Sequence, residues 1–141
     1  MDLTEHQRRA LDDLDEYDQG QKRIAYLDGV CDQLRAQMAA LPSSLPQDTV
    51  RVQGSRGTSD SKLIAILDQI SQAEQERSRL STDLEHTLDR IVSSMTETEA
   101  ALIKLRHKWG LSFDAIGKTL YMSRSQVHRA YWEALELYGQ R

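Results

Sequence analysis

The sequence of 141 residues has little of several residue types, and each shortage excludes a class of protein. Cys31 is its only cysteine, so the chain can form no internal disulfide and no cysteine-based zinc site. Aromatic residues make up 6% of the chain and prolines number two, a composition typical of a helical protein with a modest core. The N-terminus has no apolar signal core, and no apolar run approaches membrane-spanning length. We therefore expect a cytoplasmic protein without a membrane partner.

Patterns of catalysis and of cofactor binding are also missing. The chain has no nucleophile elbow, no dinucleotide-binding fingerprint and no Walker sequence. Its histidines lie far apart, and none has a Cys, Asp or Glu partner at the spacing of a metal site. These are His6, His86, His107 and His128. We expect no enzyme, no catalytic residue, no metal and no cofactor.

Charge is distributed unevenly along the chain. The formal net charge is −4, but from Met95 onward there are seven Lys/Arg against five Asp/Glu, a local balance of +2. The residues before Met95 carry eleven Lys/Arg and seventeen Asp/Glu, a balance of −6. An acidic N-terminal part joined to a mildly basic C-terminal part suggests two different roles. Because +2 is small, we expect non-specific affinity for nucleic acid to be weak and sensitive to salt.

Residues 1–94 are predicted to form two long helices. Thr4 and Gln7 fit a capping box at the start of the first helix, and Asp60 or Ser61 is the expected N-cap of the second. Along both helices the apolar residues alternate spacings of three and four, which is typical of a coiled-coil or antiparallel hairpin seam. The segment 42–60 between them holds both prolines and two glycines, which predicts a flexible loop.

Such a helical hairpin has a thin core. Cys31 falls on the apolar stripe of the first helix, where a buried and inert thiol is expected. At about 25 cal/mol per Å² of buried apolar surface, two helices alone are marginally stable. We therefore predict that residues 1–94 self-associate, giving a homodimer in the simplest case or a higher homo-oligomer.

Residues 95–141 are predicted to form a separate helical domain. Thr96 and Glu99 fit a capping box that opens its first helix, and Gly110 is well placed as the residue after that helix. The apolar face of this helix is predicted to comprise Leu102, Leu105 and Trp109.

The segment Ser112–Tyr131 predicts two short helices joined by a tight turn. Ser112 can cap the first, while Ser123 and Gln126 fit a capping box at the start of the second, about 123–138. Only Tyr121 and Met122 connect the two helices, and such a short connection means that the helices must cross at a steep angle. This arrangement is a helix-turn-helix, which offers its second helix to the major groove of DNA.

The outward face of that second helix carries the candidate DNA contacts. At 100° per residue, Val127 faces inward and the opposite side presents polar residues near the helix start. Arginine can bond guanine or hold a phosphate, and serine and histidine can do either less selectively. Gln126 can contact a base, although capping explains it equally well. The candidates are Arg124, Ser125, Gln126, His128 and Arg129, with Ser112, Lys108 and Lys118 at the phosphates. The alternative is that all are ordinary solvated residues.

The stretch Met95–Leu135 resembles region 4 of bacterial sigma factors, in its W-G-L-S turn followed by S-R-S-Q-V-H-R. The whole chain is similar to phage regulators of the ArpU/RinA type. This resemblance implies an all-α fold, a coiled-coil-like hairpin followed by a sigma region 4-like helix-turn-helix. It also implies a regulator of late phage genes that binds double-stranded DNA in a bacterial host cell. The chain departs from the family at Gly117, where Ala is usual, and at Tyr121, Trp132 and Glu133.

Two other functions fit the same pattern. One is an oligomeric phage DNA-recognition subunit, such as a small terminase component, which also joins a helix-turn-helix to helical oligomerisation segments. The other is a protein-interaction module whose helix-turn-helix contacts RNA polymerase and never DNA.

Overall fold

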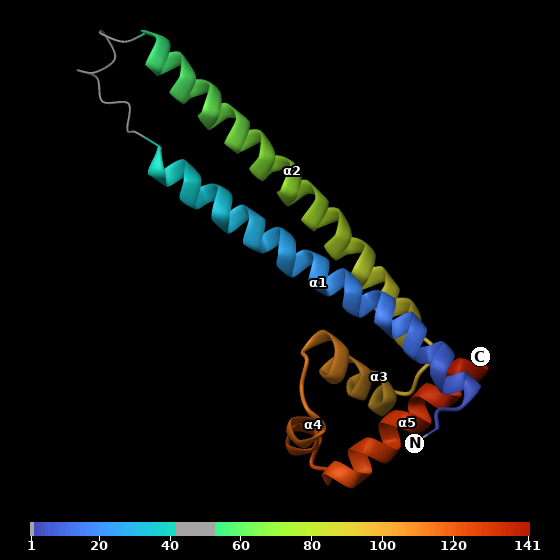
Figure 1. Cartoon of the computed structure of the whole chain (residues 1–141). Coiled ribbons are helices and arrows are strands. Elements are labelled where there is room, and N and C mark those ends of the chain that lie inside the picture. The colour runs from blue at the N-terminus through green and yellow to red at the C-terminus, as the bar shows by residue number, and fades with distance from the viewer. Residues whose placement is uncertain (1, 42–52) are drawn as a thin grey trace. The chain divides into compact units, whose positions relative to one another are not determined.

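The computed structural model describes residues 2–41 and 53–141, with side chains from residue 60 onward in the second range. Every regular element of these residues is a helix, so the predicted all-α class is confirmed. The helices in Figure 1 are α1 (Glu5–Ala40), α2 (Gln53–Val92), α3 (Glu97–Ile103), η2 (Lys104–Lys108), α4 (Phe113–Leu120) and α5 (Arg124–Gln140).

The two long helices begin differently from one another. At the start of α1 the capping box is formed as predicted, since Thr4 and Gln7 exchange two backbone–side-chain hydrogen bonds of 3.1 Å. The predicted cap of α2 at Asp60 or Ser61 is wrong, because α2 already begins at Gln53. No proline follows Pro46 to stop the helix, and each residue added to an existing helix gains a hydrogen bond. Residues 42–52 of the expected loop lie outside the described residues.

The chain divides into two compact units, and each takes segments from both long helices. One comprises Lys22–Ser81, and the other joins Met1–Gln21 to Thr82–Arg141. This division differs from the predicted segments 1–94 and 95–141, because the first 21 residues group with the C-terminal helices.

In the unit Lys22–Ser81, α1 and α2 pack along an apolar seam. Leu27 and Cys31 of α1 contact Ala73 of α2, and Cys31 is buried as predicted. Arg77 of α2 pairs with Asp28 of α1. Two further ion pairs, Arg23–Glu76 and Arg35–Glu74, also join the helices. All of these charged side chains are about half exposed, so the ion pairs contribute little to stability.

The other unit has a larger core, built from all of its α-helices. Its buried apolar side chains come from α1, α2, α3, α4 and α5. They are Ala10, Leu14, Tyr17, Leu84, Leu88, Ile91, Leu102, Ile103, Ile116, Val127, Tyr131, Ala134 and Leu135. The capping box of Thr96 and Glu99 opens α3 as predicted. This core fixes the C-terminal helices that carry the candidate site.

A π-helical turn, η2, separates α3 from α4. The N–H of Trp109 donates to the carbonyl of Lys104, five residues back, at 3.1 Å. Gly110 then adopts φ +67°, as its predicted position after the helix requires. The extra residue in the turn rotates the next residues about the helix axis, so Trp109 is 65% exposed. Its predicted place on the apolar face with Leu102 and Leu105 is therefore wrong.

Candidate nucleic-acid interface

The connection between α4 and α5 is short and fully specified by local contacts. Ser112 caps α4 by accepting from the N–H of Ala115, as predicted. α4 ends at Tyr121, which adopts the left-handed conformation at φ 59° and ψ 44°. The N–H of Met122 then returns to the carbonyl of Gly117 at 2.8 Å. The chain therefore changes direction sharply within one turn, and Figure 1 shows α4 nearly end-on while α5 runs across the view.

Gly117 permits this close return of the chain. A Cβ atom at this position would lie 2.5 Å from the carbonyl oxygen of Met122. That oxygen belongs to the backbone of the turn, so it cannot move aside as a flexible side chain could. Glycine at position 117 therefore has a steric reason, which the close approach of this turn supplies.

The start of α5 is held from two directions. The predicted capping box is present, with Ser123 and Gln126 exchanging hydrogen bonds of 2.8 and 3.1 Å. Beneath it, Val127 packs in a fully buried cluster with Leu102 of α3 and Ile116 of α4. The inward side of α5 is thereby fixed, and its outward side is left to solvent.

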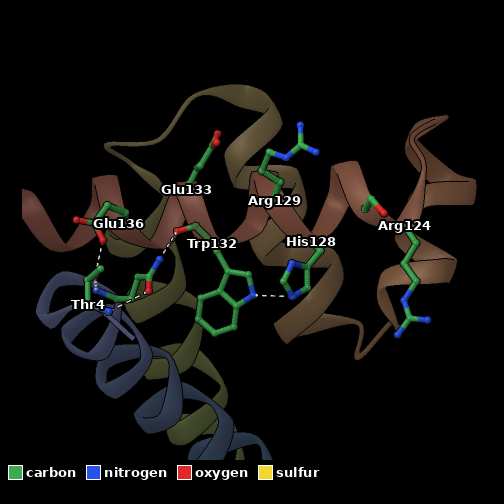
Figure 2. A pocket seen from close by; sticks show the side chains of 9 residues that line it. Thr4, Arg124, His128, Arg129, Trp132, Glu133 and Glu136 are labelled. Carbon is green, nitrogen blue, oxygen red and sulfur yellow. Dashed lines mark hydrogen bonds between the residues drawn. The ribbon is translucent and has the colours of Figure 1, made fainter. Parts of the chain in front are cut away.

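Four of the predicted contacts lie together on that outward side. We call Arg124, Ser125, His128 and Arg129 the outer face of α5; all four side chains are exposed. They line a hollow of about 850 Å³. Figure 2 shows both arginines extended away from the helix. The same hollow is bordered further along by Trp132, Glu133 and Glu136 of α5 and by Thr4 and Gln7 of α1.

The other four predicted contacts lie elsewhere. The side chains of Gln126 and Ser112 are engaged in their helix caps. Lys118 is exposed near the end of α4. Lys108 lies in a different depression, of about 230 Å³, whose lining includes the carboxylates Glu85 and Asp89. The structure thus brings together the α5 residues and leaves the predicted phosphate contacts dispersed.

The N-terminus of α1 borders the hollow, which the sequence did not predict. The Thr4 hydroxyl donates to Glu136, and the Gln7 amide donates to the carbonyl of Trp132 at 3.3 Å. The bond from Thr4 is the main reason that the pKa of Glu136 is lowered. At Gly139 a Cβ atom would lie 2.1 Å from the backbone oxygen of His6, so the two helices meet backbone to backbone. Gly139, in the last turn of α5, was the available signal, because a glycine allows another backbone to approach closely.

Aromatic rings surround His128 on the outer face of α5. The indole N–H of Trp132 donates to His128 Nε2 at 3.2 Å, as the dashed line in Figure 2 shows. The ring of Phe113, the first residue of α4, meets His128 edge-on at 5.5 Å between centroids. Tyr131 packs against both Phe113 and Trp132 at 5.3 Å. His128 is therefore exposed to solvent but fixed in orientation.

A second histidine joins α1 to α5 beneath this surface. His107 Nδ1 lies 3.2 Å from both carboxylate oxygens of Asp18, and its Nε2 lies 2.8 Å from the Tyr131 hydroxyl. Burial raises the pKa of Tyr131 to about 12, so this hydroxyl keeps its proton at neutral pH. His107 lies in the π-helical turn η2. The sequence predicted no contact among His107, Asp18 and Tyr131. Their contacts attach the middle of α5 to the long helix α1.

A hydrogen bond to α1 also holds the end of α5. The Tyr138 hydroxyl donates to Asp13 at 2.7 Å. Burial, with this bond and the charge of Asp13, raises the pKa of Tyr138 to about 12. α5 is thus attached to α1 at both its middle and its end.

Neither a membrane segment nor a metal site emerges from the described residues. Among the helices that the structure describes, none combines the length and the apolar character that crossing a membrane requires. Within that same part of the chain, no three or more His, Cys, Asp or Glu side chains gather where they could hold a metal ion.

Compared with protein-family models, with curated proteins and with solved structures, the chain finds no match in any of the three.

Proposed function

We propose that the chain is a non-enzymatic, sequence-specific DNA-binding regulator of transcription, and that α4, its turn and α5 are a helix-turn-helix. The observation that carries this proposal is the outer face of α5. One side of this helix is closed on the core through Val127, while the opposite side presents two arginines, a serine and a histidine to solvent in its first two turns. Docking of such a helix start in the major groove is how helix-turn-helix proteins contact bases.

Each residue of the outer face has a defined role in the proposed complex. Arg124 and Arg129 bond guanine or hold phosphates, and Ser125 and His128 add shorter contacts. Lys118, which is exposed on α4, contacts the phosphate backbone of the DNA. The carboxylates Glu133 and Glu136 border the same hollow, so they repel phosphates beyond the second turn. The proposed affinity therefore depends on base contacts more than on total charge. Control of late phage genes is the biological role that the family resemblance adds.

The first test is a titration of DNA binding by fluorescence anisotropy at two salt concentrations. We expect Arg129→Ala to weaken specific binding by about 1–3 kcal/mol if Arg129 contacts a base. Arg79→Ala is a matched control, because it removes the same charge from an exposed position of α2 outside this face. Unchanged affinity of a folded Arg129→Ala variant would remove the assignment of Arg129. Absence of any saturable binding by the wild-type chain would remove the function.

We also propose that the chain acts as a homodimer, joined through Lys22–Ser81 in a coiled-coil-like hairpin. Three of its large apolar side chains are substantially exposed, namely Tyr26, Ile64 and Leu67. A dimer would match the two-fold symmetry of many helix-turn-helix binding sites. We expect light scattering to give twice the chain mass and the double variant Ile64→Glu/Leu67→Glu to give the monomer mass. A monomeric wild-type chain would contradict this assembly, and a ring of many subunits would favour the small-terminase type.

A protein partner, such as RNA polymerase, is the second candidate function. It is favoured by the exposure of two aromatic side chains on the C-terminal helices. Tyr121 is 95% exposed at the turn, and Trp109 is 65% exposed after η2. Exposed aromatic residues of this kind are enriched where proteins bind one another. A folded chain that binds polymerase but no DNA would establish this function instead.

A further inference from the structure

The hydrogen bond between Trp132 and His128 determines where the histidine carries its proton. An indole N–H is a donor only, so His128 Nε2 must accept the 3.2 Å bond with its lone pair. A neutral imidazole that accepts at Nε2 carries its proton on Nδ1. Trp132 therefore leaves Nδ1–H as the free donor of His128.

The surroundings of His128 keep this donor available. Phe113 contacts the ring edge-on and Trp132 bonds its Nε2, so the ring is restrained on two sides. Within the described residues, His128 Nδ1 has no hydrogen-bond partner. The side chain is exposed and lines the hollow on the outer face of α5. A restrained donor without a partner is suited to contact an acceptor on a bound molecule.

We infer that Trp132 positions His128 as a hydrogen-bond donor that selects a guanine in the DNA site. This inference rests on the proposed DNA-binding function. In the major groove guanine presents two neighbouring acceptors, N7 and O6, whereas cytosine presents the N4 amine, a donor that Nδ1–H cannot bond. Adenine presents an amine donor beside its N7 acceptor, and thymine presents one acceptor beside a methyl group. Guanine is thus the base that best fits a single fixed donor.

Trp132 is in this view a positioning residue and His128 the residue that touches the base. Without the indole N–H, either imidazole nitrogen can hold the proton, and the ring loses one of its two restraints. The selectivity of His128 for an acceptor should then weaken while the other residues of the outer face still bind. Trp132→Phe is the suitable variant, because it removes the N–H and keeps an aromatic ring against Tyr131.

The test begins with selection of a binding site from random duplex DNA by the full chain. Each guanine of the selected site is then replaced in turn by 7-deazaguanine, which removes the N7 acceptor, and affinity is measured by anisotropy. Guanines that Arg124 or Arg129 contacts through N7 will also bind more weakly after this replacement. Among the affected guanines we expect one at which wild-type binding weakens about tenfold, the loss of one well-made hydrogen bond, and at which this loss depends on His128. His128→Ala should bind the normal and the modified site equally. Trp132→Phe should show a loss clearly smaller than that of the wild type.

The outcomes separate this inference from the function on which it rests. If no site can be selected, the proposed function fails and the inference falls with it. If a site is selected but no guanine loses its N7 effect in His128→Ala, the function stands and the histidine contact is wrong. A full N7 effect in Trp132→Phe would overturn the positioning role of Trp132. Arg79→Ala is the control, and it should retain the tenfold N7 effect because its exposed side chain on α2 lies outside the outer face of α5.

Discussion

Replacement of Gly117 by alanine is expected to lower the free energy of unfolding by about 1–3 kcal/mol, the usual cost of overpacking a close contact. The new methyl group would lie 2.5 Å from the carbonyl oxygen of Met122, closer than real Cβ atoms approach. Relief would require the turn to move, yet its 2.8 Å hydrogen bond to the Gly117 carbonyl and the buried Val127 hold it in place. The gain that alanine ordinarily gives inside a helix, up to about 1 kcal/mol, would be outweighed.

Urea or thermal denaturation measures this effect, and Gly29→Ala provides its control. Gly29 also lies inside a helix, but a Cβ atom there would meet nothing within 4 Å. This control is expected to stabilise the chain by about 0.4–1 kcal/mol, because it restricts the unfolded state without strain. If Gly117→Ala were as stable as Gly29→Ala, the tight return of the chain between α4 and α5 would be contradicted. Loss of DNA binding with unchanged stability would instead indicate a change confined to the orientation of α5.

Local patterns predicted the starts of α1, α3, α4 and α5 well, although not that of α2, because a helix cap involves residues only three apart. The pairs Thr4–Gln7, Thr96–Glu99 and Ser123–Gln126 all form the expected reciprocal hydrogen bonds. Gly110 adopts positive φ after η2 as its position required. Each of these features depends on the identity of one or two residues and on no distant contact, so the sequence alone was sufficient.

Two kinds of feature were missed from the sequence: the π-helical turn, and the contacts between residues that lie far apart in the chain. The π-helical turn at Lys104–Lys108 inserts one residue per turn, which a 3.6-residue periodicity cannot represent, and Trp109 was misplaced as a result. The attachment of α1 to α5 joins residues that are more than 120 positions apart, for example Gln7 and Trp132. Helical periodicity indicates which face of α5 is buried, but it does not indicate which helix covers that face.

For the candidate site, too, the sequence predicted which residues share a face but not the contacts between them. Periodicity placed Arg124, His128 and Arg129 on one exposed face, and they do line one hollow. Trp132 also lines that hollow, but the hydrogen bond that it makes to His128 depends on side-chain rotamers. The hydrogen bond between Thr4 of α1 and Glu136 at the border of the hollow could not be predicted, because it joins two helices that meet only in the folded chain. The sequence therefore indicated the composition of the surface and not the contacts that organise it.

Replacement of His107 by alanine is expected to destabilise the unit that contains α3, α4 and α5 by about 2–4 kcal/mol. The imidazole side chain is 10% exposed and bonds Asp18 of α1 on one side and Tyr131 of α5 on the other. Its removal leaves a cavity and a buried Tyr131 hydroxyl without its partner. Asp18 is 38% exposed and can regain water, so the tyrosine bears most of the loss.

His86→Ala is the matched control for this measurement, since His86 is an exposed histidine on α2 and should change stability by less than about 0.5 kcal/mol. A double-mutant cycle then tests the link to α1. Because Asp18 and His107 contact each other, Asp18→Ala should cost less in the His107→Ala background than in the wild type. Additive effects would contradict a direct contact between α1 and the C-terminal helices at this point. Coupling would mean that the long helix α1 is attached through His107 to Tyr131, one helical position from the Trp132 that orients His128.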